Sequence, residues 1–161
     1  MSEIVFFDVE TTAPSPAGRW WLLEFGAILV CPRKLVEVAS YETLIRPGDL
    51  SAVSRRFTDV EAIASAPTFR EVADKIFDIL DGTYASFLLP PPSIDTSTHE
   101  LRLLASFPLT HETCCRTHTG RVWAGHNIQR FDCPRLREAF ADIGRPAPEP
   151  AGVIDSLNVL A

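Results

Sequence analysis

The sequence predicts an α/β fold in which a mixed sheet is flanked by helices. Three observations predict it. Three apolar runs rich in β-branched and aromatic residues come first, two segments with helical spacing follow, and strand and helix patterns alternate near the end. The 161 residues fit one domain, and 46% hydrophobic with 22% charged residues indicates a folded core.

The three apolar runs are the first elements that we expect. They are "IVFFDV" at 4–9, "WWLLEFGAILV" at 20–30 and "LVEVASYETLIRP" at 35–47. A loop rich in Pro and Gly at 13–18 separates the first two. Because the connections are short, the runs are expected to pair as an antiparallel meander of strands.

Two segments after the meander, 59–67 and 68–82, have helical spacing. In the second segment, Thr68 is placed to cap the N-terminus and Gly82 to end the helix. Apolar side chains recur on one face of this segment: Phe69, Val72, Ile76, Phe77, Ile79 and Leu80. This spacing is typical of an amphipathic helix.

Regular patterns return after residue 120. Residues 121–127 are expected to form a strand with a polar end, and residues 130–144 a helix. Pro134 lies near the first turn of that helix and Gly144 follows its end. Residues 152–161 are expected to form a short strand or turn that enters another helix.

The segment 83–120 differs from the rest of the chain. It holds 11 Ser or Thr and 4 Pro among 38 residues, with 5 charged groups and no sustained period. A long stretch of this kind inside a domain is either functional or disordered. We predict one incomplete domain over 1–161, interrupted at 83–120 by a disordered insertion or a translated intron.

The charge balance limits the partners of the chain. The formal net charge is -6, so binding of nucleic acid would need local arginine patches or bound cations. The N-terminus lacks the basic region of a signal peptide, and no apolar run is long enough to span a bilayer. These features predict a soluble, intracellular protein, nuclear or cytoplasmic, without a membrane partner.

The cysteines follow no disulfide spacing and are expected to be reduced thiols. They are Cys31, Cys114, Cys115 and Cys133. The stretch "HETCCRTH" at 111–118 holds ligand types that zinc accepts, but adjacent cysteines are poorly placed to chelate one tetrahedral ion. Zinc binding there is the less favoured interpretation.

Two acids on the first expected strand, in "FFDVETT", require an explanation. Asp8 and Glu10 are two residues apart and therefore point to the same face of a strand. Neighbouring carboxylates repel each other, and a divalent cation would neutralise them. Asp132, in "HNIQRFD" just after the strand at 121–125, is the best third ligand. The alternative without a metal role is that Asp8 and Glu10 are solvated acids at an exposed strand end.

The motifs "FDVETT" and "HN" followed by "FD" resemble those of the DEDDh (DnaQ-like) 3′–5′ exonucleases, which have a ribonuclease H-like fold. The strand patterns "EFGAI" and "YETLIRP" are also similar to that family. The resemblance covers about 3–82 and 121–161. The stretch "VWAGHNIQRFDCPRLREAF" is most similar to plant exonuclease-domain proteins linked to phloem cell enucleation.

The resemblance implies catalytic and metal-binding roles for Asp8, Glu10 and Asp132. Two Mg²⁺ or Mn²⁺ ions would be held there, with Asp8 bridging them, Glu10 on the nucleophile side and Asp132 on the other. One ion would activate water and the other would stabilise the leaving 3′ oxygen. For Asp132, an acid in the first turn of a helix is also expected from the helix dipole alone.

The resemblance also implies substrate contacts at Thr11, His126 and Asn127. Thr11 matches a position near the 3′ end of the substrate. His126 and Asn127 lie beside the second motif, where shaping the site or contacting substrate is favoured over catalysis. For His126, a hydrogen-bonded histidine at a strand end is an equally good interpretation.

One departure from the family concerns its third motif, a histidine with an aspartate five residues later. The region matching "VIDSLNVLA" precedes that motif, and Ala161 is the last residue of the chain. We therefore expect a fold that is truncated at the C-terminus and an activity that is much weaker than that of a longer relative. Asp155 is a possible substitute ligand, but an N-cap role is favoured.

The function expected from these observations is hydrolysis of single-stranded DNA or RNA from 3′ ends. The alternative is a non-catalytic module on the same fold that binds nucleic acid or a protein. A third possibility is a chain that does not form a stable fold. The sequence does not choose between DNA and RNA and does not indicate an oligomeric state.

Overall fold

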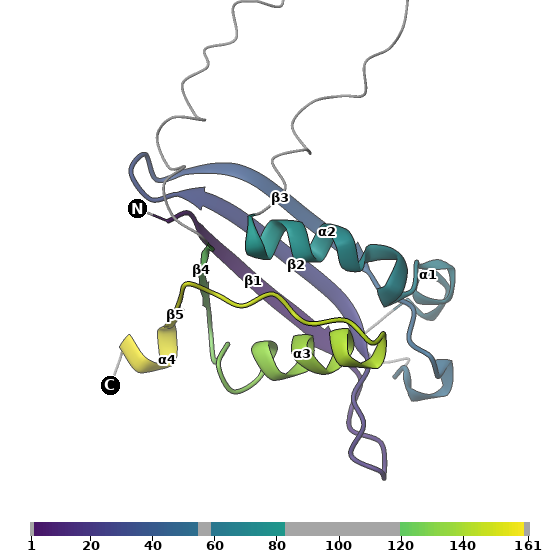
Figure 1. Ribbon diagram of the computed structural model, residues 1–161. Helices are drawn as coiled ribbons and strands as arrows, with labels where there is room; N and C mark the ends of the chain where they lie inside the picture. The colour runs from purple at the N-terminus through teal and green to yellow at the C-terminus, as the bar shows by residue number, and fades with distance from the viewer. Residues whose placement is uncertain (1, 55–58, 83–119, 160–161) are drawn as a thin grey trace, which may run out of the picture.

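A mixed sheet of five strands is the framework of the protein in the computed structural model, which describes residues 2–54, 59–82 and 120–159 (Figure 1). The strands are β1 (Ile4–Thr11), β2 (Leu22–Cys31), β3 (Val36–Leu44), β4 (Val122–Gly125) and β5 (Gly152–Asp155). Their order in the sheet is β3-β2-β1-β4-β5. The first three pair antiparallel, whereas β4 pairs parallel with β1 and β5. The predicted meander and mixed sheet are confirmed.

The helices follow the predicted segments closely. They are α1 (Val60–Ser65), α2 (Phe69–Asp81), α3 (Asp132–Asp142) and α4 (Ser156–Val159), with a short 3₁₀ helix at Leu50–Ala52 that was not predicted. Helices α2 and α3 lie on the same side of the sheet (Figure 1). The 3₁₀ turn depends on a local contact, since the Asp49 carboxylate accepts a hydrogen bond from the Ser51 amide.

The ends of α2 are set by the residues that the sequence indicated. At its start, Thr68 and Glu71 form a capping box, which satisfies amides that have no partner within the helix. At its end, Gly82 adopts the left-handed conformation, with φ +80°. Arg121 then donates from Nη1 to the carbonyls of Asp78 and Ile79, which satisfies two of the last acceptors.

The main core lies between the sheet and the helices α2 and α3. Alternate residues of β1 face it, namely Val5, Phe7 and Val9. The largest side chains buried from other elements are Phe25, Trp123, Ile76, Leu80, Leu136 and Phe140. The Trp123 ring meets Phe7 edge-on and donates from Nε1 to the Leu80 carbonyl, so β4, β1 and α2 are joined at one side chain.

The opposite face of the sheet is apolar and open. Phe6 on β1 pairs with Ile28 on β2, and both side chains are nearly half exposed. Ile154 on β5 is exposed to a similar extent. Asp8 and Glu10 lie on this face too, because they alternate with the core residues of β1.

The predicted insertion at 83–120 lies, apart from Gly120, outside the described residues, as does the Cys/His stretch at 111–118. Its two flanks meet in space: a Cβ added to Gly82 would lie 3.1 Å from Nε of Arg121. The described helices include none that is long and apolar enough to cross a bilayer. Cys133 is a buried thiol, and burial raises its pKa to about 11.

Candidate functional site

Asp132 is the first residue of α3 and is almost fully buried, at 2% exposure. Its Oδ1 accepts a hydrogen bond of 3.0 Å from the amide of Val9. An acid in the first turn of a helix is also favoured by the positive end of the helix dipole. The start of α3 is therefore fixed against the middle of β1, between the positions of Asp8 and Glu10.

Asp8 and Asp132 come together although they are far apart in the sequence. The pKa of Asp132 is raised to about 6, first because burial disfavours its charged form, and also because the Asp8 carboxyl lies beside it. The hydrogen bond from Val9 opposes this shift. Two carboxyl groups that share a site in this way are stabilised by a bound cation.

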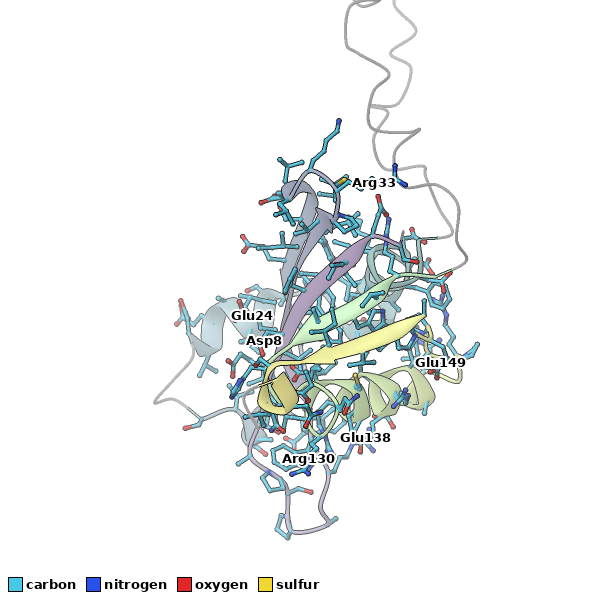
Figure 2. The ribbon with its side chains drawn as sticks, turned by 90° about the vertical axis from the view of Figure 1, so that its left-hand side faces the viewer. Asp8, Glu24, Arg33, Arg130, Glu138 and Glu149 are labelled. Carbon is cyan, nitrogen blue, oxygen red and sulfur yellow. The ribbon has the colours of Figure 1, made fainter. Side chains whose placement is uncertain are left out.

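A third acid of this edge, Glu24, was not singled out from the sequence. The register of β1 and β2 places Glu10 opposite Glu24, and Asp8 opposite Gly26. Figure 2 shows Asp8 and Glu24 at the same end of the sheet. Like charges directly opposite each other are unfavourable, so this pair adds to the negative charge on the open face. The register of the meander is the signal that would have revealed it.

The donor chemistry of this edge fits Mg²⁺ or Mn²⁺, since both ions prefer oxygen ligands. Within the described ranges, no group of three or more His, Cys, Asp or Glu side chains is gathered closely enough to hold a metal ion. Asp8 and Asp132 converge, whereas Glu10 lies farther along the same face of β1. The three-ligand set of Asp8, Glu10 and Asp132 therefore stays a prediction.

The loop that leads from β4 to α3 is folded back on itself at Asn127. This residue adopts a left-handed conformation with φ +56°, which asparagine tolerates better than most residues. Its carbonyl accepts hydrogen bonds from the amides of Arg130 and Phe131. The backbone of Asn127 thus shapes the approach to Asp132, in agreement with a shaping role, while contact with substrate stays a prediction.

Asp155 holds this loop to the end of β5. Its carboxylate accepts hydrogen bonds from the amides of Asn127 (2.9 Å), Gln129 (3.2 Å) and Leu157 (3.1 Å). Burial disfavours its charged form, but these backbone hydrogen bonds outweigh burial and lower its pKa. The bond from Leu157 confirms that Asp155 caps α4, as favoured from the sequence.

The other two predicted substrate residues are His126 and Thr11. His126 is exposed and its Nδ1 lies 2.8 Å from the Ser156 hydroxyl, as expected of a hydrogen-bonded histidine at a strand end. Thr11 is the last residue of β1 and lines a groove described below. Their contact with substrate also stays a prediction.

The comparison with known families supports the motifs. The family model described as an exonuclease, RNase T, matches residues 5–88. The chain belongs to this exonuclease family. The matched residues include β1, with Asp8 and Glu10, and extend past the end of α2, so the family that the sequence motifs indicated is confirmed.

Two relatives of this exonuclease-family chain come from Arabidopsis thaliana. Protein NEN4 is 43% identical over 166 residues, which cover 99% of this chain and 50% of NEN4. Protein NEN1 is 44% identical over 164 residues, which cover 99% of this chain and 27% of NEN1. The similarity to plant exonuclease-domain proteins is thus confirmed. The chain spans about half the length of NEN4 and about a quarter of that of NEN1.

A solved structure shares the fold of the chain. The crystal structure of Escherichia coli Exonuclease I in complex with a dT13 oligonucleotide aligns with a TM-score of 0.61 and 17% identity. The alignment covers 99% of this chain and 29% of the bacterial one. The predicted ribonuclease H-like sheet, flanked by helices, is confirmed by this similarity.

Proposed function

We propose that the chain is a 3′–5′ exonuclease domain that hydrolyses single-stranded DNA or RNA with the aid of Mg²⁺ or Mn²⁺. The observation that carries this proposal is the buried carboxyl of Asp132 held beside Asp8 in an exonuclease-family fold. The bound dT13 strand of the bacterial Exonuclease I supports single-stranded nucleic acid as the substrate class. We propose an intracellular location, nuclear or cytoplasmic, for this activity.

The residues of the chain would divide the work as follows. Divalent ions at the acids would supply activation of water and stabilisation of the leaving oxygen. The Val9 amide holds one oxygen of Asp132, which fixes the direction of its carboxylate. Asp8 and Glu10 present their carboxylates from one face of β1, and Thr11 ends that strand beside them. Asp132 must lose its proton to bind an ion, so binding is expected to strengthen as pH rises through about 6.

The test combines metal binding with strand shortening. Mn²⁺ binding is measured by calorimetry, and a single-stranded oligonucleotide labelled at its 5′ end is incubated with Mg²⁺ or Mn²⁺. We expect binding to the unaltered chain and products shortened from the 3′ end. Asp8→Asn and Asp132→Asn should abolish both, whereas Glu37→Gln should change neither, because Glu37 is an exposed acid near the start of β3, at the end of the sheet away from Asp8. Shortening that persists in both site variants would refute the proposed site.

The affinity of this site for divalent ions is expected to be low. Two rather than three ligand side chains converge in the described part of the chain, and fewer ligands hold a cation less firmly. The same observation favours a second candidate, a non-catalytic module that binds nucleic acid or a protein. That candidate predicts no Mn²⁺ binding and no effect of Asp8→Asn on the affinity for single strands. Divalent-dependent shortening that is lost in Asp8→Asn would exclude it.

A further inference from the structure

A groove of about 510 Å³ opens at the end of the sheet where β1 terminates. Its floor and walls come from Thr11, the stretch 18–22, the segment 45–48 that follows β3, the start of α2 and the second half of α3. This volume lies within the range of ligand sites in proteins, about 300–1,000 Å³. The groove is therefore large enough for more than a water molecule.

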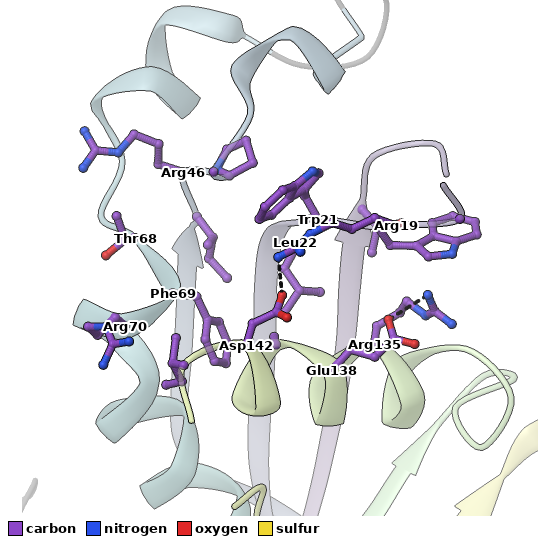
Figure 3. A pocket seen from close by; sticks show the side chains of 18 residues that line it. Arg19, Trp21, Leu22, Arg46, Thr68, Phe69, Arg70, Arg135, Glu138 and Asp142 are labelled. Atoms are coloured by element: carbon purple, nitrogen blue, oxygen red, sulfur yellow. Dashed lines mark hydrogen bonds and ion pairs between the residues drawn. The ribbon is translucent and has the colours of Figure 1, made fainter. Parts of the chain in front are cut away.

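The groove is rich in arginine although the protein is acidic. Arg19, Arg46, Arg70 and Arg135 line it, together with the acids Glu138 and Asp142. Figure 3 shows Arg46 and Arg70 along one wall, across the groove from Arg135 and Glu138. In a chain with a formal net charge of -6, this is a local excess of positive charge. Such a cluster attracts phosphate groups.

Two of the arginines are held in place by tryptophan rings. The guanidinium of Arg19 lies 4.0 Å from the centre of the Trp21 ring, and that of Arg135 lies 5.0 Å from the centre of the Trp20 ring. Stacked guanidinium groups lose less freedom when they bind a ligand. In the described part of the chain, Nε of Arg135 is buried without a hydrogen-bond acceptor. A buried donor of this kind calls for an acceptor oxygen.

Carboxylates already bind both of these arginines. Nη1 of Arg135 lies 2.9 Å from Oε2 of Glu138. Nη2 of Arg19 lies 2.7 Å from Oδ2 of Asp142, and both side chains are about half exposed. A half-exposed ion pair is weak, so an anion of higher charge density competes with it readily. Asp142 thus occupies part of the arginine cluster that a phosphate would use.

Two residues of the groove lie close in sequence to the acids of the candidate metal site. Thr11 follows Glu10 directly, and Arg135 lies one turn of α3 after Asp132. The Trp20 ring packs edge-on against Phe131, the residue before Asp132. A strand whose 3′ end lies at the acids would therefore pass the arginines.

We propose that this groove binds the phosphate backbone of single-stranded nucleic acid. The proposal rests on the function proposed above and assigns the part of the strand that leads away from the 3′ end. The arginines bind the phosphates, and Asp142 limits the affinity by competing for Arg19.

The test measures binding without cleavage. A fluorescein-labelled oligothymidylate is titrated with the protein in EDTA, and anisotropy is followed over a range of salt concentrations. The variant pair is Arg46→Gln with Arg70→Gln, since both side chains are exposed and form no salt bridge within the described ranges. The matched control is Arg33→Gln with Lys34→Gln; Figure 2 shows Arg33 at the opposite end of the sheet from Asp8.

The variant pair is expected to lose about tenfold in affinity at low salt. The slope of log K against log salt should fall by about 1.4, because two single-strand phosphate contacts contribute about 0.7 each. The control pair should bind like the unaltered chain, and Asp142→Asn should bind more tightly. Equal loss in the two pairs, or no loss in either, would overturn the proposal.

Two further experiments complete the test. The first distinguishes a nucleic-acid strand from free phosphate as the ligand, and the second distinguishes the groove proposal from the proposed function. Free thymidine monophosphate and inorganic phosphate should displace the oligonucleotide only at far higher concentrations; displacement at equal concentration would overturn the strand as the ligand. Asp8→Asn should keep strand binding in EDTA while losing divalent-dependent shortening. If shortening survives in Asp8→Asn, the function proposed above fails, whereas normal binding by the Arg46 and Arg70 variant refutes the groove alone.

Discussion

Without a bound cation, the buried carboxylate of Asp132 lowers the stability of the folded protein at neutral pH. Its pKa in the folded state, about 6, lies above the ordinary value of 3.8 that an aspartate has in the unfolded chain. The folded state therefore holds the proton more tightly, so the contribution to stability is full below pH 3.8 and is lost as pH rises through about 6. A shift of this size corresponds to about 3 kcal/mol.

The first prediction concerns the removal of this charge. In EDTA at neutral pH, Asp132→Asn should raise the free energy of unfolding by about 2 kcal/mol, because the amide oxygen still accepts from Val9 and no buried charge remains. Urea unfolding of both proteins between pH 4 and pH 8 measures the effect. The gain should vanish near pH 4. A variant that is less stable than the unaltered chain at neutral pH would contradict the prediction.

At this scale the sequence allowed much to be predicted. The spacing of Asp8 and Glu10 placed both on one face of a strand, and that is where they lie. Thr68 and Gly82 marked the ends of α2 because caps are local interactions. Glu24 was missed because its position opposite Glu10 depends on the register between two strands. A register is a property of two segments together.

The loop from β4 to α3 shows how one side chain can position a whole element. Asp155 accepts from three amides in two segments, and the loop that it holds ends at Asp132. Its pKa is lowered, so its contribution to stability is present above the unfolded value near 3.8 and is lost on acidification. The site thus depends on a carboxylate at the end of β5 as well as on its own acids.

The second prediction uses two substitutions of Asp155. Oδ1 accepts from Asn127 and Leu157, whereas Oδ2 accepts from Gln129. In Asp155→Asn, the amide oxygen can take the place of Oδ1 and keep the bonds from Asn127 and Leu157. The Gln129 amide then loses its acceptor, whereas in Asp155→Ala all three amides lose theirs. Each donor left unsatisfied costs about 1–3 kcal/mol.

Hydrogen exchange of the three amides is the measurement. We expect faster exchange at Gln129 in the asparagine variant and at all three amides in the alanine variant. Ser51 provides a control, since its amide is held by Asp49 at a distant 3₁₀ turn. If the Asn127 amide and the Gln129 amide each exchange at the same rate in both variants as in the unaltered chain, the role of Asp155 is refuted.

For the elements, the helices and the meander could be predicted because their signals are local. The position of β4 beside β1 could not be predicted in this way. Parallel strands are joined by a long connection, and neither strand's sequence determines the path of that connection. The convergence of Asp8 and Asp132 follows from that pairing. The sequence motifs indicated the convergence through resemblance rather than through geometry.

At the scale of the whole molecule, the residues on the two sides of the segment 83–119 contact each other directly. Arg121 reaches back to the last carbonyls of α2, and Gly82 lies next to its side chain. Its guanidinium also pairs with Glu3, 2.9 Å away, so the start of β1 is tied to the same point. The two flanks of 83–119 are therefore joined by contacts of their own.

The third prediction is that residues 83–119 can be replaced by two glycines without loss of the fold. Closing a loop about eighteen times shorter should raise the free energy of unfolding by about 2.5 kcal/mol. Urea unfolding measures this. A Gly/Ser linker of the original length is the matched control and should leave stability unchanged. Loss of a cooperative transition in the shortened chain would show that the segment belongs to the fold.

The strand order has a further consequence, for the time that the chain needs to fold. β1 meets β2 across the short stretch 12–21, but it meets β4 only after 12–121 has been brought into place. Contacts between distant residues slow folding, because the entropy of the enclosed chain is lost before the contact is gained. The meander is thus expected to form first and then serve as the template for β4 and β5. In stopped-flow experiments the shortened chain should refold faster and unfold at an unchanged rate.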